Sequence, residues 1–168
     1  MSKERVIHIR KARPDDAVRV MKILREELAE ADLNLPEPED GPALIWIISV
    51  IAQGFVMVAE MSGRIVGSIG LSAQTFPWAP SAWFMGWSWF FVLKGFREGG
   101  TAVQLAKRMN ALADEKGAKI VGTVMTAHQP ELKDRLVKML GFTYCGGYFA
   151  RGFTKVEPAE SSGEEEAA

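Results

Sequence analysis

The sequence KGFREGGTAVQLAKRM, residues 94–109, joins a long apolar run to an amphipathic segment. The apolar run covers residues 83–93, and apolar positions recur at helical spacing from Thr101 onward. The pattern predicts a strand, a tight turn and a helix over residues 101–116. Two consecutive glycines, Gly99 and Gly100, stand just before this helix, although glycine loses more conformational freedom on folding than any other residue. Bare backbone at this turn therefore needs an explanation.

A glycine-rich turn between a strand and a helix is typical of phosphate sites. Such a turn directs several unpaired backbone N–H groups at one point, with the positive end of the helix dipole behind them. Gly99 and Gly100 would let a phosphate approach the backbone, and Arg97 can add a charge-assisted hydrogen bond. Glu98 opposes this unless its side chain turns outward. The simpler interpretation is that the glycines only make a tight turn.

The rest of the chain reads as alternating short strands and helices. Residues 43–53 are apolar throughout and are predicted as a buried helix, too short to span a bilayer, which takes about 20 apolar residues. The other predicted elements are a strand at 6–12, a helix opened by Pro14-Asp15-Asp16 and ending near Ala31, a hairpin of 55–60 and 64–73, an irregular connection at TFPWAPSA, a strand at 119–124, a helix at 131–140, and two strands around Gly146-Gly147.

Composition bounds the class of protein. The 168 residues are 48% hydrophobic and 24% charged, which is ordinary for one globular domain. We expect the domain to span residues 1–155 and the acidic end, residues 156–168, to be a disordered tail. The net charge of -1 provides no basic field, so neither nucleic acid nor a membrane is an expected partner.

Cysteine and histidine usage argues against disulfides and metals. Cys145 is the single cysteine, and the two histidines lie far apart in the sequence, so no metal-ligand spacing is present. The N-terminus carries charges throughout and lacks the apolar region of a secretory signal. These features predict a cytoplasmic protein, and they leave both a monomer and a homodimer open.

Residues of the glycine turn resemble a known family. Arg97-x-x-Gly100-x-Ala102 is similar to the Q/R-x-x-G-x-G/A signature of the GNAT N-acetyltransferase superfamily, and it stands between a long strand and a long helix as in that family. The likeness covers about residues 5–153 and includes Leu140-Gly141-Phe142, which is similar to a late L-G-F of the family. The resemblance implies a single-domain α/β fold with a mixed, mostly antiparallel central sheet and helices on both faces.

The resemblance also implies a cofactor and a reaction. Acetyl-CoA would donate an acetyl group to an amine of unknown identity. The pantetheine arm would lie along backbone groups of Phe90, Val92 and Leu93. The turn would hold the pyrophosphate through Arg97, Glu98, Gly99, Gly100, Thr101 and Ala102. Two alternatives stay open: a coenzyme A binding module without catalysis, and a structural or interaction protein on the same fold.

The catalytic positions of the family are not matched. Val137 occupies the place of the tyrosine that usually acts as acid, Pro130 stands where an asparagine is common, and Ser88 is the one polar side chain of the fourth strand. Substitutes for proton transfer are His128, Tyr144 and Tyr148, each with a purely structural alternative. Cys145, which lies between the two tyrosines, has the structural interpretation of a small buried apolar residue. The acids that could serve as base are Glu60, Glu37, Glu39 and Asp40.

Four of the five tryptophans fall within residues 78–89. Trp83, Trp87 and Trp89 share strand parity, and the family resemblance implies that this region borders the acceptor channel, where they would form an aromatic wall. A sheet face buried under a helix explains them equally well. If the wall exists, it favours an apolar or aromatic amine, or a hydrophobic peptide end, over a polyanion.

Overall fold

The computed structural model describes residues 6–30, 36–121 and 130–144 of the 168-residue chain. The elements in chain order are β1 (His8–Lys11), the 3-10 turn η1 (Pro14–Asp16), α1 (Ala17–Ala29), α2 (Asp40–Ala52), β2 (Val56–Met61), β3 (Arg64–Phe76), β4 (Ala79–Val92), η2 (Lys94–Phe96), α3 (Thr101–Glu115), β5 (Ile120–Val121) and α4 (Pro130–Met139). The predicted acidic tail and most of the predicted final strand pair lie outside the described residues. Residues 142–144, which are described, are in no strand.

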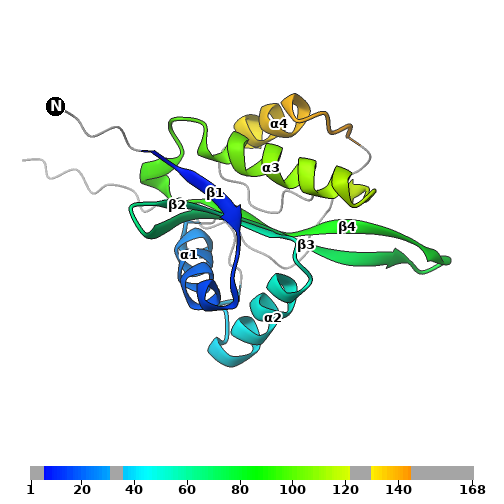
Figure 1. The fold of residues 1–168 in the computed structure, drawn as a ribbon, viewed down its shortest axis with the longest axis horizontal. Coiled ribbons are helices and arrows are strands. Elements are labelled where there is room, and N and C mark those ends of the chain that lie inside the picture. The colour runs from blue at the N-terminus through cyan, green and yellow to red at the C-terminus, as the bar shows by residue number, and fades with distance from the viewer. Residues whose placement is uncertain (1–5, 31–35, 122–129, 145–168) are drawn as a thin grey trace, which may run out of the picture.

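The five strands form one sheet in the order β1-β2-β3-β4-β5. Neighbouring strands are antiparallel except for β4 and β5, which are parallel. Figure 1 shows α1 and α2 on one face of the sheet and α3 and α4 on the other. The predicted mixed, mostly antiparallel sheet with helices on both faces is therefore confirmed.

Each face has its own apolar core. Under α1 and α2 the buried side chains include Val20, Ile47 and Val58. Under α3 they include Leu105, Met109 and Leu71. Because the sheet is covered on both faces, β2 and β3 are long apolar runs rather than alternating patterns.

The predicted irregular connection at TFPWAPSA is wrong. β3 continues to Phe76 and β4 begins at Ala79, so the two strands pair almost to their ends and form an arm that projects beyond the sheet (Figure 1). Aromatic packing supports this arm, with the Phe76 and Phe84 ring centroids 4.8 Å apart. The register shifts next to Phe76, and Pro80 is accommodated beside this irregularity.

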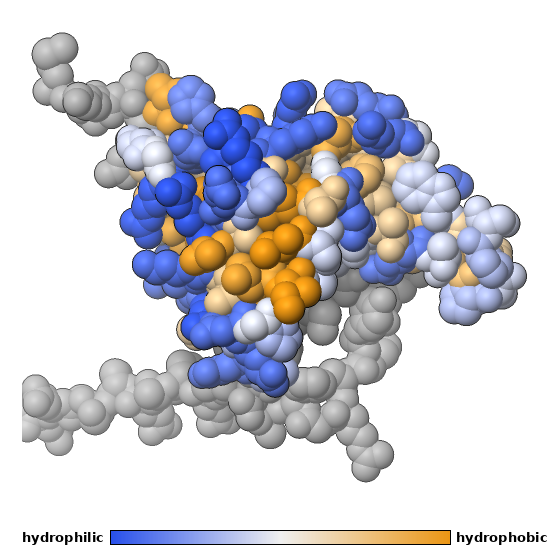
Figure 2. Space-filling view, turned by 60° about the horizontal axis from the view of Figure 1, so that its bottom comes forward, coloured by the Kyte–Doolittle hydropathy of each residue, from blue (hydrophilic) through white to orange (hydrophobic). Residues whose placement is uncertain are grey.

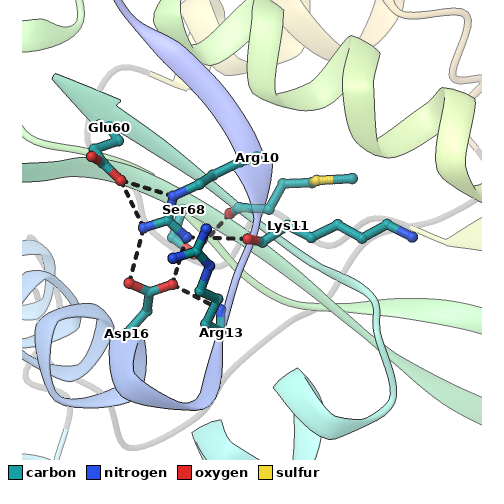
Figure 3. A network of polar contacts seen from close by, with 7 residues as sticks. Arg10, Lys11, Arg13, Asp16, Glu60 and Ser68 are labelled. Carbon is teal, nitrogen blue, oxygen red and sulfur yellow. Dashed lines mark hydrogen bonds and ion pairs between the residues drawn. The ribbon is translucent and has the colours of Figure 1, made fainter. Parts of the chain in front are cut away.

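A polar network ties the start of α1 to the sheet (Figure 3). The Arg10 guanidinium donates to both carboxylate oxygens of Asp16, at 2.7 and 3.0 Å, and to Glu60 at 2.8 Å. Asp16 also accepts the backbone N–H of Arg13 at 2.8 Å. Asp16 is buried, and its hydrogen bond with Arg10 lowers the pKa of the carboxyl group. Glu60, a predicted alternative base, is therefore held in an ion pair.

Candidate functional site

The turn between β4 and α3 adopts backbone that glycine favours. Gly99 has φ of 94° and Gly100 has φ of 80°, both in the left-handed region. A Cβ atom at either position would meet nothing within 4 Å, so the space in front of the turn is open. Helix α3 begins directly afterwards, and its first hydrogen bond runs from the Gln104 N–H to the Gly100 carbonyl at 2.9 Å.

The N–H groups at this helix start are unpaired. In the part of the chain that the structure describes, no hydrogen bond is made by the backbone N–H groups of Glu98, Gly99, Gly100, Thr101, Ala102 or Val103. The side chain of Glu98 is exposed and therefore turns outward, and the Thr101 hydroxyl is buried without a hydrogen-bond partner among the described residues. Open space, unpaired donors and the positive end of α3 meet at one place. This arrangement suits an anion.

The Arg97 side chain does not face that open space, contrary to the expectation that it would contact a phosphate. Its Nε donates to the Val92 carbonyl at 2.8 Å, and its terminal nitrogen pairs with Glu30 at 2.8 Å and Glu27 at 3.1 Å. Both acids lie at the end of α1 or just after it. Arg97 therefore fixes the turn to α1, because two carboxylates and a carbonyl already occupy its guanidinium.

The end of β4 leaves a strand edge open next to the turn. β5 pairs with β4 only at Met85 and Gly86, so within the described residues β4 has no neighbour on that side from Trp87 onward. Hydrogen bonds of an antiparallel pair alternate along the strand. Since the Leu93 N–H donates to the Val66 carbonyl at 2.9 Å, Phe90 and Val92 direct their backbone groups away from β3.

The three residues predicted to pair with the pantetheine arm therefore differ in the backbone groups that they leave unpaired within the described residues. Phe90 keeps its N–H and carbonyl unpaired within the described residues, and Val92 keeps its N–H, while the Val92 carbonyl accepts from Arg97. Leu93 has no backbone group left to offer, because its carbonyl also accepts the Phe96 N–H at 2.8 Å. The open edge consists of Phe90 and Val92, without Leu93.

The prediction that Trp83, Trp87 and Trp89 form one aromatic wall is wrong, because Trp89 lies on the other face of the sheet from Trp87. The register of β3 and β4 shifts so that Trp89 lies opposite Gly70 while Trp87 lies opposite Leu71, which leaves Ser88 as an extra residue in a β-bulge. The bulge breaks the alternation on which the prediction relied. Trp89 consequently packs in the core under α1 and α2, whereas Trp87 packs against the core under α3.

The surroundings of the tryptophans differ accordingly. Trp89 donates to the Ser68 hydroxyl at 3.0 Å and meets the Trp46 ring edge-on, with centroids 5.2 Å apart. Trp87 packs edge-on against Phe142 at 5.5 Å, and its Nε1 is buried without a hydrogen-bond partner in the described residues. Trp83, on the projecting arm, is 46% exposed.

The face that carries α1 and α2 has a hydrophobic surface patch. Figure 2 shows apolar side chains gathered on this side of the molecule. The large exposed apolar residues of α2 are Ile45, Trp46 and Ile48. Through Trp46 this patch is continuous with Trp89, one residue from the bulge of β4.

The candidate catalytic groups are only partly placed. Tyr144 lies five residues after the end of α4 and is 78% exposed. His128, Tyr148 and Cys145 lie outside the described residues. Val137, in the family's tyrosine position, is half-buried in α4. At the bulge, the Ser88 hydroxyl lies 2.9 Å from the Ser72 hydroxyl, within hydrogen-bonding distance.

The acidic candidates are not gathered into a site either. Glu37 and Glu39 are exposed, and Asp40 forms an ion pair with Arg25. Within residues 6–30, 36–121 and 130–144, no group of three or more histidine, cysteine or acidic side chains is arranged to hold a metal. None of the helices placed in those ranges has the length and apolarity required to cross a bilayer.

Sequence comparison and structure comparison give different results. No protein-family model matches the sequence, and no curated protein is significantly similar to it. Solved structures do match. A predicted acetyltransferase from Clostridium acetobutylicum, crystallised with acetyl-CoA, is 17% identical with a TM-score of 0.71, over 87% of this chain and 96% of that one.

Two further structures agree with the first. A GCN5-related N-acetyltransferase from Ralstonia eutropha is 22% identical with a TM-score of 0.67, over 87% of this chain and 98% of that one. An aminoglycoside N-acetyltransferase in complex with CoA is 18% identical with a TM-score of 0.65, over 90% of this chain and 97% of that one. At these identities the likeness establishes the architecture, and the chain has the fold of the GNAT N-acetyltransferases.

Proposed function

We propose that the chain is a GNAT N-acetyltransferase that binds acetyl-CoA and transfers its acetyl group to an amine. One observation carries the proposal. The unpaired N–H groups of the turn and the open edge of β4 lie at the end of the same strand, where a single ligand with an anionic part and an extended amide part can use both. Acetyl-CoA has this composition, and structural neighbours of the chain were crystallised with acetyl-CoA or CoA.

The backbone groups of this site are of the chemical types that acetyl-CoA would need. The N–H groups of Gly99, Gly100, Thr101 and Ala102 would hold the pyrophosphate, since the open space in front of both glycines leaves room for it. Phe90 and Val92 would pair with the amides of the pantetheine arm as a neighbouring strand does. Arg97 would act by fixing the turn through Glu27 and Glu30.

The transfer itself moves one acetyl group and one proton. The neutral amine nitrogen attacks the thioester carbonyl carbon, a C–N bond forms, the C–S bond breaks, and the proton lost by nitrogen balances the thiolate that leaves. Bound acetyl-CoA supplies the activated carbonyl. A positioned acid or base contributes about 10² to 10⁴ in rate, and the candidates for that role here are Tyr144, Tyr148 and His128.

The acceptor is proposed to combine an amine with an apolar part. Two structural neighbours act on polar amines, an aminoglycoside and agmatine. In this chain α2 presents Trp46, Ile45 and Ile48, all exposed by 40% or more, and Trp46 contacts Trp89 next to the β4 bulge. An apolar or aromatic portion of the acceptor would bury this surface, which is favourable in proportion to the apolar area removed from water.

A coenzyme A binding module without catalysis is the second candidate. Val137 favours it, because an alkyl side chain stands where the family usually has a proton donor. Orientation of two reactants can still give slow transfer without a dedicated acid. The two candidates therefore differ in turnover and agree in cofactor binding.

Calorimetry with acetyl-CoA, followed by a thiol-release assay, separates these alternatives. Binding with thiol release on one or more amines supports the transferase, and the amines to be compared are aminoglycosides, agmatine, aromatic amines and hydrophobic peptides. Tyr144→Phe, Tyr148→Phe and His128→Ala then identify the acid or base, since its loss lowers turnover by about 10² or more without changing cofactor affinity. Binding without turnover on any of these amines favours the module. Absence of binding contradicts both.

A further inference from the structure

A groove on the α1 side of the sheet is lined by charged residues that neither the turn nor the β4 edge uses. It has a volume of about 300 Å³ and lies between α1, the β2–β3 turn and the residue that follows β4. Its base consists of Ile23, Ile65 and Leu93, all buried. Its charged lining is Arg19, Lys22, Arg64 and Glu26.

The groove carries an excess of positive charge. Three cations against one carboxylate leave a formal excess of two positive charges (3 − 1 = 2). In the described part of the chain, Arg19, Lys22 and Arg64 make no hydrogen bond or ion pair with a carboxylate. Arg64 lies over the Phe96 ring instead, 5.9 Å from its centroid.

Two acids next to this groove pair with the arginine of the turn. Arg19, Lys22 and Glu26 follow helical spacing along one stripe of α1, and Glu30, directly after the helix, continues that stripe. Glu30 and Glu27 both form ion pairs with Arg97. A groove lined by several cations around apolar residues suits an anionic group on a ligand with an apolar or aromatic part.

The groove also adjoins the candidate cofactor turn. Leu93, which directly follows the open edge, lines the groove, and Arg64 contacts Phe96, one residue before Arg97. We propose that this groove, formed by Arg19, Lys22 and Arg64, binds a phosphate monoester. The source would be either the ribose 3′-phosphate of the coenzyme A molecule held at the turn, in which case the inference rests on the proposed function, or a separate phosphorylated molecule.

Dephospho-coenzyme A distinguishes the two sources because it lacks only the 3′-phosphate. If the groove holds the phosphate of coenzyme A, calorimetry will show coenzyme A binding about tenfold more tightly than dephospho-coenzyme A, as expected for one charge-assisted contact. Arg64→Gln and Lys22→Gln should each reduce that preference. Lys116→Gln, which removes one exposed positive charge at the far end of α3, should leave it unchanged.

Inorganic phosphate serves as the probe for a separate ligand, followed by ³¹P NMR in the presence of saturating coenzyme A. Saturable phosphate binding that Arg64→Gln weakens and Lys116→Gln does not, together with equal affinities for the two coenzymes, supports the groove with a separate ligand. Equal coenzyme affinities without phosphate binding overturn the groove and leave the proposed function intact. If neither coenzyme binds, the proposed function fails, and phosphate binding to the free protein alone decides whether the groove is an anion site.

Discussion

Helices α1 and α3 both begin at the end of a strand-and-turn segment, and their first turns differ in one respect. At the start of α1 the polar groups are paired: Asp16 accepts the Arg13 N–H and two bonds from Arg10, which also reaches Glu60. At the start of α3 no side chain caps the helix, and its first N–H groups have no partner in the described residues.

The paired groups at the start of α1 contribute to the stability of the fold, whereas the unpaired N–H groups at the start of α3 are available to bind a ligand. A buried donor or acceptor without a partner destabilises a protein, so helix starts that serve only the fold are normally capped. Before α1 the rule is met at the start of η1, where the Asp16 carboxylate accepts the Arg13 N–H, while α1 itself continues from η1 without a side-chain cap. The start of α3 departs from it next to the exposed residues Glu98 and Gly99, where water can satisfy N–H groups until a ligand replaces it, although Thr101 itself is buried. Changes at α1 should therefore affect folding, and changes at α3 should affect cofactor binding.

The largest expected effect is on cofactor affinity in Gly100→Asp. The new carboxylate would stand in the open space in front of the turn, where the pyrophosphate is proposed to bind, and would repel it. Calorimetry should show acetyl-CoA affinity reduced by roughly 100-fold or more. The melting temperature should change little, because aspartate is tolerated in left-handed backbone better than most residues.

Gly100→Asn is the matched control, since it has the same shape without the charge. It should weaken binding less than Gly100→Asp, with the difference shrinking at high salt. Equal affinity of wild type and Gly100→Asp for acetyl-CoA would show that the turn is not the pyrophosphate site.

Asp16→Asn should give the largest loss of stability. The substitution removes the charge that pairs with Arg10 and leaves buried hydrogen bonds imperfectly matched, while Glu60 still pairs with Arg10. We expect the free energy of unfolding to fall by about 2 kcal/mol, measured by urea denaturation. Acetyl-CoA affinity of the folded variant should be unchanged. A loss of affinity with unchanged stability would reverse the roles assigned to the two helix starts.

The pH dependence of stability should also depend on the ionised carboxylate of Asp16. Because the pKa of Asp16 is lowered in the folded protein, this group stabilises the fold above its unfolded value of about 3.9, and that contribution disappears as the pH falls through the folded pKa. Melting curves of wild type and Asp16→Asn should therefore converge as the pH drops below about 4. A stability difference that stays constant down to the folded pKa would exclude this ion pair as its cause.

The smallest expected effect is on cofactor affinity in Glu30→Gln. If Arg97 fixes the turn to α1, weakening that ion pair should lower acetyl-CoA affinity by a few-fold at most, because Glu27 and the Val92 carbonyl still hold the guanidinium. If Arg97 instead served as a phosphate ligand, releasing it from Glu30 would raise affinity. The sign of the change in calorimetry decides between these roles.

The elements and the turn were predictable because their signals are local. Periodicity placed α3 at Thr101, and the consecutive glycines indicated the left-handed backbone that Gly99 and Gly100 adopt. The mixed sheet followed from a family resemblance centred on the same turn. These features depend on residues close together in the sequence, which is the information that a single sequence contains.

The wrong predictions concern features that depend on residues far apart in the sequence. The aromatic wall assumed unbroken alternation, but the bulge at Ser88 depends on how β4 meets Gly70 and Leu71 of β3. A Cβ at Gly70 would lie 2.5 Å from the Trp89 ring, so the position of that ring depends on a strand almost 20 residues away. Arg97 was expected at the phosphate because Glu27 and Glu30 are 70 and 67 residues distant.

Backbone amide NMR during a titration with coenzyme A tests whether the turn before α3 binds the pyrophosphate. We expect saturable shifts of the N–H resonances of Gly99, Gly100, Thr101 and Ala102, as a phosphate becomes their hydrogen-bond acceptor. The N–H resonance of Arg13, already bonded to Asp16, should stay unchanged and provides an internal control. Binding without shifts at the four turn residues, or no binding, would contradict the account.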